Sequence, residues 1–406
     1  MVSTPVSVCL IVSSLEFGGA ERQVIALAQS FDAARVRPIV CSLSDEVPLV
    51  NRISDRRWAL QIVRKRGRFD FTTIFRVARL LRRERVDVVH AFLFDAEIVA
   101  RLAGMFARVP VVVASERNSN YARPLLHRAA LALTQPLFDV MVANSHEGRR
   151  FNMRTLGLPE SRIEVVHNGV DVEHFCPDEQ AGLACRLKLG IPSDDPVIGM
   201  VGSYKRQKAH DSFLQMARQV HRLIPRTRFL VVGEVLRDGF AASSQLKTET
   251  VALAESLGLG HHCIFLDKQN DMRAIYNACN LTVLLSTREG TPNALLESMA
   301  CGIPVIASDV ADNSIIVIGK LTGHIVPPGD QDRAADCAVE LLSDPARRKE
   351  MGAAAREYVS RHYSIAESAR KMESVYRTYL ARKKLKFSAM WRQPIRLKQL
   401  HRTNAL

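Results

Sequence analysis

The sequence contains no long apolar segment. None of it approaches the roughly 20 consecutive apolar residues that cross a bilayer, although 47% of the 406 residues are hydrophobic. The first residues, MVSTPVSVCLIVSS, lack the basic segment and cleavage site of a secretory signal and instead predict a buried strand. We therefore expect neither export nor a membrane span.

The eight cysteines include no C-x-x-C pair. Cys9, Cys41 and Cys301 lie inside apolar runs, where a reduced cysteine behaves as a small hydrophobic residue. Without the spacings of a disulfide framework or a zinc site, we expect a protein of the reducing cytosol. No G-x-G-x-x-G follows a predicted strand, which argues against a nicotinamide dehydrogenase.

Acidic residues are absent from the last 26 residues, which hold eight Lys or Arg and so more than half of the net charge of +14. A second basic block runs from Arg52 to Arg85. Within it, helical spacing places one set of residues on an apolar face and another on a basic face: Ile74, Phe75, Ala78 and Leu81 against Arg76, Arg79, Arg82 and Arg83. The block is either a solvated helix face or a surface for anionic lipid headgroups. No zinc-finger or RNP-like pattern accompanies the charge, so we expect no nucleic-acid partner.

Short apolar runs alternate with helical patterns, which indicates parallel sheets with crossover helices. The expected strands are VSVCLIVSS, RPIVCSL, VDVVHAF, PVVVASE, DVMVANS and IEVVHNG, then VIGMVGS, TRFLVVGE, CIFLD, LTVLLS, PVIASD and GHIVPP. We predict an α/β protein with two doubly wound Rossmann-like domains facing a central cleft at the carboxyl ends of both sheets. The predicted division is 1–170 for the first domain, 171–195 for a linker, 196–365 for the second domain, and 366–406 for a crossover helix and basic tail.

The segment from Ser286 to Val310, STREGTPNALLESMACGIPVIASDV, places two glutamates eight positions apart. Thr291 followed by Pro292 predicts an N-cap and the start of a helix, with Gly302 just after its end. The N-terminus of such a helix attracts an anion such as phosphate. Because a carboxylate would repel that phosphate, Glu289 and Glu297 should bind neutral hydroxyls on either side of it. The pattern favours a nucleotide sugar; the alternative is that both are ordinary surface residues.

This segment resembles the Glu-x7-Glu motif, here EGTPNALLE, of the retaining group 1 (family 4) glycosyltransferases, which have the GT-B fold. The similarity continues in SMACGIPVIASDV and LTGHIVPPGD. It includes FGGAERQVIALA (Phe17–Ala28), VVHNGVD (Val165–Asp171) and GSYKRQKAHDSFLQMA (Gly202–Ala217). The resemblance therefore covers most of the chain, and it implies an acceptor-binding first domain and a nucleotide-sugar-binding second domain.

The resemblance implies roles for individual residues. Glu289 would contact the donor sugar, Glu297 would hold the nucleotide ribose, and Lys208 would neutralise the diphosphate, unless it is an ordinary solvated lysine. The implied donor-binding residues are Gly18, Gly19, Gly202, Ser203, Arg206, Lys208, Glu289, Gly290, Thr291, Pro292, Asn293, Ala294 and Glu297. Gly18 and Gly19 would permit close approach of the backbone, or would form an ordinary tight turn. The expected catalytic residues are Glu289, Lys208 and Arg117.

Several positions depart from the family's pattern. Ser203 replaces the usual arginine, and Arg206 is the candidate to supply that charge. The loop SERNSN stands where many members carry a catalytic histidine, so the acceptor-side candidates are Glu116, Arg117 and Asn118, with His90 as a further candidate or a structural histidine. The segment ADNSIIV leaves unassigned the contact that an acidic residue often makes in this family.

We therefore expect a retaining glycosyltransferase that moves a hexose-type sugar from a nucleotide diphosphate sugar to a saccharide or lipid-linked saccharide in cell-surface polysaccharide synthesis. We expect no cofactor and no metal, because the Asp-x-Asp at Asp330–Asp332 fits a helix N-cap. The protein would be cytoplasmic and peripheral at the inner face of an anionic membrane. The alternatives are a GT-B sugar-nucleotide epimerase, a phosphorylase, for which no cofactor lysine is identified, and a non-catalytic membrane-surface scaffold.

Overall fold

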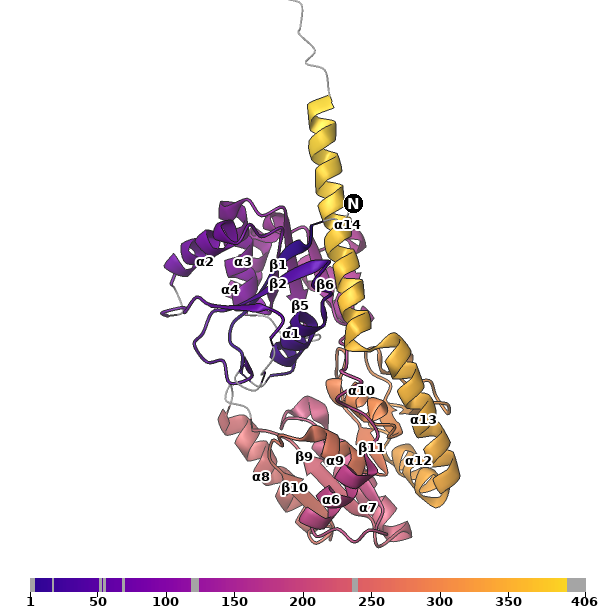
Figure 1. Ribbon diagram of the computed structural model, residues 1–406. Coiled ribbons are helices and arrows are strands. Elements are labelled where there is room, and N and C mark those ends of the chain that lie inside the picture. Colours follow the sequence, from indigo (N-terminus) through magenta and orange to yellow (C-terminus); the bar gives the residue numbers. More distant parts are fainter. Residues whose placement is uncertain are drawn as a thin grey trace, which may run out of the picture.

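The protein forms two lobes, each built on its own parallel sheet (Figure 1). This computed structural model describes residues 4–16, 18–50, 53, 56–67, 70–117, 124–235 and 240–392, with the backbone alone at 116, 240 and 386–392. Within the described residues, no helix is both long and apolar enough to cross a membrane.

The N-terminal sheet is doubly wound, with the order β3-β2-β1-β4-β5-β6-β7. Its strands are β1 (Val6–Val12), β2 (Val36–Ser42), β3 (Ala59–Ile62), β4 (Val88–Phe92), β5 (Val111–Glu116), β6 (Val140–Ala143) and β7 (Ile163–Val165). The strand order reverses between β1 and β4. In such sheets, ligands bind beyond the carboxyl ends of the strands at this reversal.

The C-terminal sheet repeats this plan in the order β10-β9-β8-β11-β12-β13. Its strands are β8 (Val197–Val201), β9 (Arg228–Val232), β10 (Cys263–Leu266), β11 (Leu281–Leu284), β12 (Val305–Ser308) and β13 (Gly323–Val326). Here the strand order reverses between β8 and β11, so the loops that follow these two strands are placed to bind a ligand.

Helices cover both faces of each sheet (Figure 1). Those of the N-terminal lobe are α1 (Gly19–Ser30), α2 (Thr72–Arg83), α3 (Phe94–Ala107), α4 (Leu125–Leu133) and α5 (His146–Leu156). The others are α6 (Glu179–Lys188), α7 (His210–Leu223), α8 (Phe240–Ser256), α9 (Met272–Ala278), α10 (Asn293–Ala300), α11 (Asn313–Ile316), α12 (Gln331–Ser343), α13 (Pro345–His362) and α14 (Ile365–Arg392). Successive residues of β1 point to opposite faces: Leu10 packs with α1 and α14, and Ile11 with α2 and α3.

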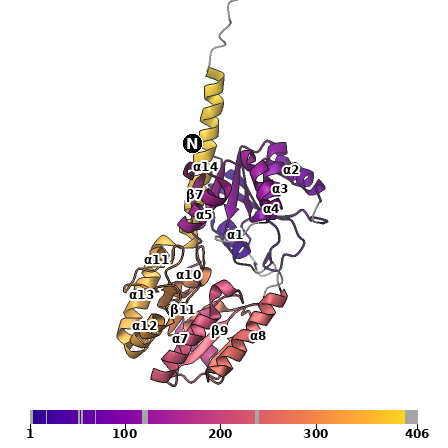
Figure 2. The same cartoon turned by 180° about the vertical axis from the view of Figure 1, so that it is seen from behind.

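The last helix, α14, returns to the N-terminal lobe and passes next to α5 and β7 (Figure 2). Its Met372 and Tyr376 are buried in the core formed by β1 and α1. Where α14 begins, the chain crosses the segment that leaves the first lobe: the Val170 N–H donates to the Tyr363 carbonyl at 2.9 Å, and the Ile365 N–H donates to the Val170 carbonyl at 2.8 Å. A Cβ at Gly169 would lie 2.5 Å from the Ile365 Cα, so this close crossing requires glycine.

Every strand predicted from the sequence is present. The edge strand β3 was not predicted, because it has four partly exposed residues and no apolar run. The expected linker, 171–195, contains α6, which packs on α9 of the C-terminal lobe. The N-cap prediction at Asp330 is confirmed, since its carboxylate accepts from the Arg333 N–H at 2.9 Å.

The basic helix α2 forms as predicted, with one error in its faces. Ile74, Ala78 and Leu81 are buried, but Phe75 is 59% exposed. Its place in the core is taken by Val77 and Leu80, which lie closer to the centre of the buried face. All eight cysteines are free, and Cys9, Cys41 and Cys301 are buried in the apolar cores as expected.

Candidate active site

The Glu-x7-Glu segment lies in the loop after β11 and in helix α10. The helix begins at Asn293, with Pro292 as its N-cap. The expectation that Thr291 caps the helix is wrong, because Pro292 occupies the N-cap position. The Thr291 hydroxyl donates instead to the carbonyl of Asn144 in the other lobe. Gly302 follows the helix with φ +72°, as predicted for the residue after its end. Glu289 therefore lies before the helix and Glu297 inside it.

Lys208 and Glu289 form an ion pair. The Lys208 Nζ lies 2.6 Å from Glu289 Oε1, and the two side chains are 15% and 7% exposed. Lys208 ends a short 3-10 turn after β8, and its aliphatic stem lies over Gly202, where a Cβ would come within 3.3 Å. Ser203 is half-buried beside it. The structure thus brings Lys208, which is predicted to bind the diphosphate, into contact with Glu289, which is predicted to bind the sugar.

Glu297 is held by a tyrosine on the neighbouring helix. The Tyr276 hydroxyl donates to Glu297 Oε2 at 2.8 Å. Burial raises the pKa of Glu297, and the Tyr276 hydrogen bond and the positive charge of Arg22 act against that rise. Arg22 belongs to α1 of the N-terminal lobe, so the two lobes face each other at this carboxylate.

The loop before α10 contacts the N-terminal lobe directly. A Cβ at Gly290 would lie 2.7 Å from Asn144 Oδ1, so only glycine fits there while Asn144 stays in place. At the start of α10, the Asn293 side chain approaches the Gly19 carbonyl at 3.5 Å. Gly18 is the N-cap of α1 and, like Gly19, has no positive φ.

A chain of polar side chains connects Arg117 to the start of α10. Arg117 donates to Asn168 Oδ1 at 2.5 Å, and Asn168 Nδ2 donates to the Thr291 carbonyl at 2.9 Å and to Asn293 Oδ1 at 2.8 Å. Gln23 also donates to Asn293 Oδ1, at 3.3 Å. Burial lowers the pKa of Arg117 to about 10, so it remains a cation at neutral pH. Its positive charge lies beside the boundary between the lobes.

The acceptor-side candidates besides Arg117 are His90, Glu116 and Asn118. His90 is fully buried, hydrogen-bonded through Nδ1 to the Tyr376 hydroxyl at 2.7 Å and stacked on Phe92. Of the two alternatives for His90, the structure supports the structural histidine and not a place at the cleft, because α14 covers it. Burial lowers the pKa of His90 well below its usual value, so it is neutral. Asn118 and the Glu116 side chain lie outside the described residues.

Arg206 does not join Lys208. Its side chain is 84% exposed and lies 3.8 Å from Glu249 on the outer surface. Burial raises the pKa of Glu21 in the N-terminal lobe, and the positive charge of Lys205 is among the influences that act against that rise. Arg206 therefore does not supply a second positive charge beside Lys208.

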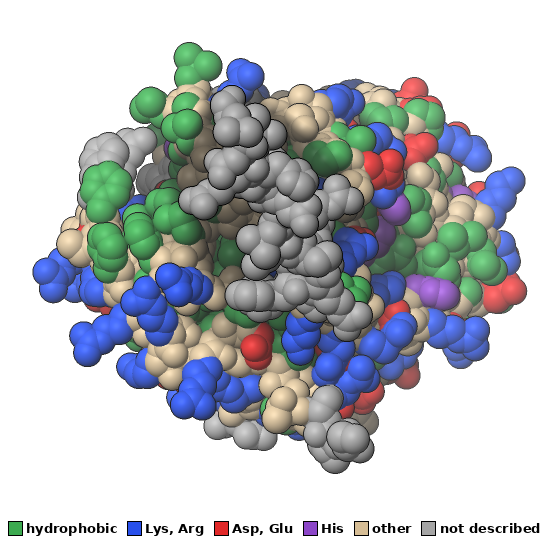
Figure 3. Space-filling view, turned by 90° about the horizontal axis from the view of Figure 1, so that it is seen from above, with side chains coloured by type: hydrophobic (Ala, Val, Ile, Leu, Met, Phe, Trp, Pro, Cys, Tyr) green, Lys and Arg blue, Asp and Glu red, His purple; other side chains and the backbone are tan. Residues whose placement is uncertain are grey.

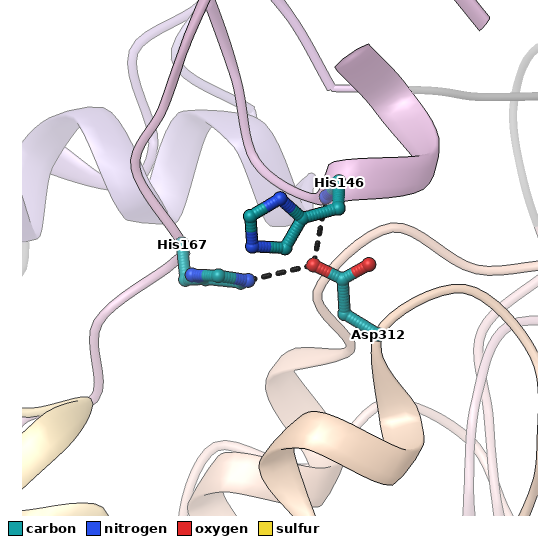
Figure 4. A group of neighbouring side chains, drawn as sticks. All are labelled: His146, His167 and Asp312. Carbon is teal, nitrogen blue, oxygen red and sulfur yellow. Dashed lines mark hydrogen bonds and ion pairs between the residues drawn. The ribbon is translucent and has the colours of Figure 1, made fainter. Parts of the chain in front are cut away.

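A further contact between the lobes uses the acidic residue of ADNSIIV. Asp312 accepts from the His146 N–H at 2.7 Å, at the start of α5, and contacts His167 Nε2 at 2.7 Å (Figure 4). Two imidazoles and a carboxylate within 4.8 Å are possible metal ligands. However, Asp312 already binds N–H groups of the other lobe, so we assign it a structural role in holding the two lobes together.

Sequence reasoning missed five residues at this boundary: Gln23, Asn144, Asn168, Tyr276 and Asp312. Gln23 and Asn168 lie inside segments that carry the family resemblance, and this position could have identified them as candidates. Asn144 and Asp312 follow strands β6 and β12 closely, where polar residues at carboxyl ends are candidates. Tyr276 gave no signal, because it lies in a short, otherwise ordinary helix.

Family profiles match both halves of the chain. One described as Glycosyltransferase Family 4 matches residues 17–174, and one described as Glycosyl transferases group 1 matches residues 185–358. The two matches lie in order along the chain and together span most of it. The group 1 match contains Lys208, Glu289 and Glu297.

Among curated relatives, the UDP-Gal:alpha-D-GlcNAc-diphosphoundecaprenol alpha-1,3-galactosyltransferase of Escherichia coli is 25% identical over 319 residues, which covers 76% of this chain and 79% of that protein. The D-inositol 3-phosphate glycosyltransferase of Mycobacterium tuberculosis is 30% identical over 268 residues, which covers 63% of this chain and 54% of that protein.

Solved structures show the same fold. The Anabaena HepE complex with UDP and glucose matches with a TM-score of 0.81 and 17% identity, over 92% of this chain and all of that one. WaaG, a glycosyltransferase involved in lipopolysaccharide biosynthesis, matches with a TM-score of 0.67 and 17% identity, over 91% of this chain and 99% of that one. The chain is therefore a group 1 glycosyltransferase with the GT-B fold.

Proposed function

We propose that this enzyme transfers a hexose-type sugar from a nucleotide diphosphate sugar, with retention of configuration, to a hydroxyl of a saccharide or lipid-linked saccharide. The observation that carries the proposal is the arrangement around the start of α10. Glu289 and Glu297 lie on either side of the helix N-terminus, and Lys208 contacts the first of them. A sugar, a diphosphate and a ribose fit this order, because a helix N-terminus attracts phosphate and the two carboxylates accept from hydroxyls.

Donor binding would exchange the partners of Lys208. The diphosphate competes with Glu289 for the ammonium group, and the freed carboxylate then accepts from the sugar hydroxyls. As the glycosidic bond breaks, negative charge grows on the departing diphosphate. Lys208, the N–H groups at the start of α10 and the Arg117 cation stabilise that charge.

Retention would arise by attack from the face of the leaving group, with the departing phosphate accepting the proton of the acceptor hydroxyl. A retaining glycosidase instead uses a carboxylate nucleophile. Glu289 would serve a different purpose here, and its pairing with Lys208 supports a role at the sugar end of a phosphate site. Closure of the two lobes would exclude water and protect the donor from hydrolysis.

The acceptor proposal follows from the relatives and the charge. The Escherichia coli relative is named for a diphosphoundecaprenol-linked acceptor, and this chain carries a net charge of +14. We assign the enzyme to cell-surface polysaccharide synthesis, at the inner face of an anionic membrane.

Nucleotide protection tests the donor site. At about 100 times its Kd, a bound nucleotide stabilises the folded protein by about 2.7 kcal/mol, so UDP, GDP or ADP should raise Tm in the wild type. A panel of nucleotide sugars with mass detection then identifies the donor, with and without a lipid-linked acceptor extract. Epimer formation without acceptor would instead indicate an epimerase, and absence of any nucleotide effect would indicate a scaffold.

A further inference from the structure

Helix α4 leaves most of its apolar surface in solvent. Its sequence, LLHRAALAL, has seven apolar residues among nine, yet Leu131 is its one buried residue. The side chains of Leu125, Leu126 and Leu133 are 78%, 79% and 81% exposed. A helix that is apolar on all sides is normally buried. Within the described part of the chain, nothing covers these three leucines.

The helix is nevertheless fixed in position. The His127 ring stacks on Phe94 at 3.9 Å between ring centres. The Arg101 guanidinium donates to the Leu131 carbonyl and to the Thr134 hydroxyl at 3.3 and 3.1 Å. A groove of about 370 Å³ runs along α4, and its apolar lining includes Leu125, Ala129, Ala132, Phe138 and Leu156. The exposed leucines therefore belong to an anchored helix with an apolar groove beside it.

A second apolar group lies on the same side of the N-terminal sheet. Phe71 and Phe75 are 68% and 59% exposed at the start of α2, and Phe106 is 41% exposed at the end of α3. The rings of Phe75 and Phe106 lie 5.2 Å apart. From above, hydrophobic side chains and Lys or Arg side chains lie together at the left edge, the side on which Figure 1 shows α2 and α3 (Figure 3). We call the outer faces of these three helices the α2–α4 surface.

The charge of the α2–α4 surface is strongly positive. Its exposed arginines are Arg79, Arg82, Arg83 and Arg128. The three helices contain two acids, Asp95 and Glu97. Glu97 is buried against Arg101 at 2.7 Å, and Asp95 lies 3.7 Å from Lys65. Arg83 pairs with Glu84, just after α2, at 3.0 Å. Among the described residues, no acid pairs with Arg79, Arg82 or Arg128, so the surface combines apolar side chains with three arginines that keep their net positive charge.

We propose that the α2–α4 surface docks on an anionic lipid bilayer, with the leucines of α4 and the phenylalanines of α2 and α3 inserted among the lipids and the arginines on the headgroups. Each inserted apolar side chain and each arginine near the surface contributes independently. A second copy of this chain fits poorly, because a symmetric contact would place arginines opposite arginines.

Docking through α4 also deepens the proposed function, on which this step rests. Arg117 and α4 belong to the same lobe, the one with the proposed acceptor side, so docking through α4 places this lobe on the bilayer. The acceptor is then a lipid-linked saccharide that stays embedded in the membrane.

Brominated lipids test insertion residue by residue. Leu126→Trp adds a fluorophore at the proposed insertion site, and Leu187→Trp adds one at the 83% exposed position of α6 in the other lobe. With vesicles of brominated phosphatidylcholine and phosphatidylglycerol, we expect strong quenching of the added signal in Leu126→Trp and none in Leu187→Trp. Equal quenching in the two variants overturns the proposal.

Vesicle co-sedimentation tests the energetics in the full chain. We expect Leu126→Glu with Leu133→Glu to weaken binding at least about tenfold, including at raised salt, where tail electrostatics are screened. Leu187→Glu should bind as the wild type does. Unchanged binding, or a wild-type dimer that these substitutions dissociate, overturns membrane docking.

The proposed function and the membrane-docking proposal can be refuted separately. Tm protection by UDP or GDP should be the same in the wild type and in Leu126→Glu with Leu133→Glu, because the contacts of α4 in the described part of the chain are mainly with α3 and α5. Loss of nucleotide protection in the wild type with intact vesicle binding would refute the donor proposal alone. Activity on a detergent-free, lipid-embedded acceptor should fall in the double variant, with activity on a water-soluble saccharide retained.

Discussion

At the scale of single residues, the pairing of Lys208 with Glu289 decides how the site works. These two oppositely charged groups lie 2.6 Å apart, and both are largely buried. Removing one partner deprives the other, largely buried charge of this ion pair. In the proposed function, donor binding separates the pair and frees Glu289.

Lys208→Met should lower kcat/KM by about a hundredfold or more, because a cation that faces the growing charge of the leaving group is lost. Arg206→Met is the matched control and should change kcat/KM by less than about twofold, since Arg206 is solvent-exposed. Steady-state kinetics with the identified donor measure both. Equal losses in the two variants would refute the assignment of Lys208.

Glu297→Gln should raise the donor KM by about tenfold with a smaller effect on kcat, because a ribose contact is made in both ground and transition states. Tyr276→Phe should act in the same direction and more weakly, since it releases the Glu297 carboxylate from its 2.8 Å hydrogen bond. Loss of all turnover in Glu297→Gln, with unchanged donor affinity, would contradict the role of ribose anchor.

At the scale of elements, α14 shows how the C-terminal helix completes the core of the N-terminal lobe. Tyr376 lies 286 positions after His90 along the chain, and the two are in contact in the N-terminal core. Sequence pattern predicted both the strand that ends near His90 and the long amphipathic helix. It gave no information that the helix covers the strand, so the sequence left open whether His90 lies at the site or in the core.

Tyr376→Phe should lower the free energy of unfolding of the N-terminal lobe by about 1–3 kcal/mol, because it leaves the buried Nδ1 of His90 without a partner. The control is Tyr358→Phe, whose lost hydrogen bond to the Ile315 carbonyl is solvent-accessible and should cost less than about 0.5 kcal/mol. Denaturant unfolding followed by the fluorescence of Trp58, in the same core, measures the difference. A Tyr376→Phe protein as stable as the control would show that the contact is dispensable.

Helix α10 shows the limit of local signals. The dipeptide Thr291-Pro292 predicted the cap, but the hydroxyl of Thr291 is used across the lobe boundary, on Asn144. The helix therefore begins at Asn293 without a side-chain cap. Its free N–H groups are left for another acceptor, which the proposed function identifies as the diphosphate.

At the scale of the whole molecule, Asp312 joins the lobes away from the glutamates. It belongs to the C-terminal lobe and accepts from the start of α5 and from His167. Burial raises the pKa of Asp312, but the hydrogen bonds from His167 and the His146 backbone outweigh this, so the pKa lies below its usual range. The ionised carboxylate is thus stabilised by the contact between lobes.

Asp312→Asn should lower the free energy of unfolding by about 1.5–3 kcal/mol near neutral pH, because the hydrogen bonds to Asp312 lose their charged acceptor. Since the folded pKa is depressed, this contribution is complete above the unfolded pKa of about 3.9. It is lost as the pH falls through the lower folded value. Thermal unfolding from neutral pH to about pH 3 should show the difference from wild type shrinking below about pH 4. Asp309→Asn, at an exposed position in the same segment, should show no such difference.

The sequence by itself determined the two parallel sheets, their strands and the segment that carries Glu289 and Glu297. These features depend on local apolar periodicity and on residue spacing within one loop and helix, and both can be read directly from the sequence. Only the tertiary structure decided that Asn144, Asn168 and Gln23 meet this segment, that α14 buries His90, and that α4 stands exposed. Each of these depends on which surfaces of distant segments face one another, and local pattern carries no information on that.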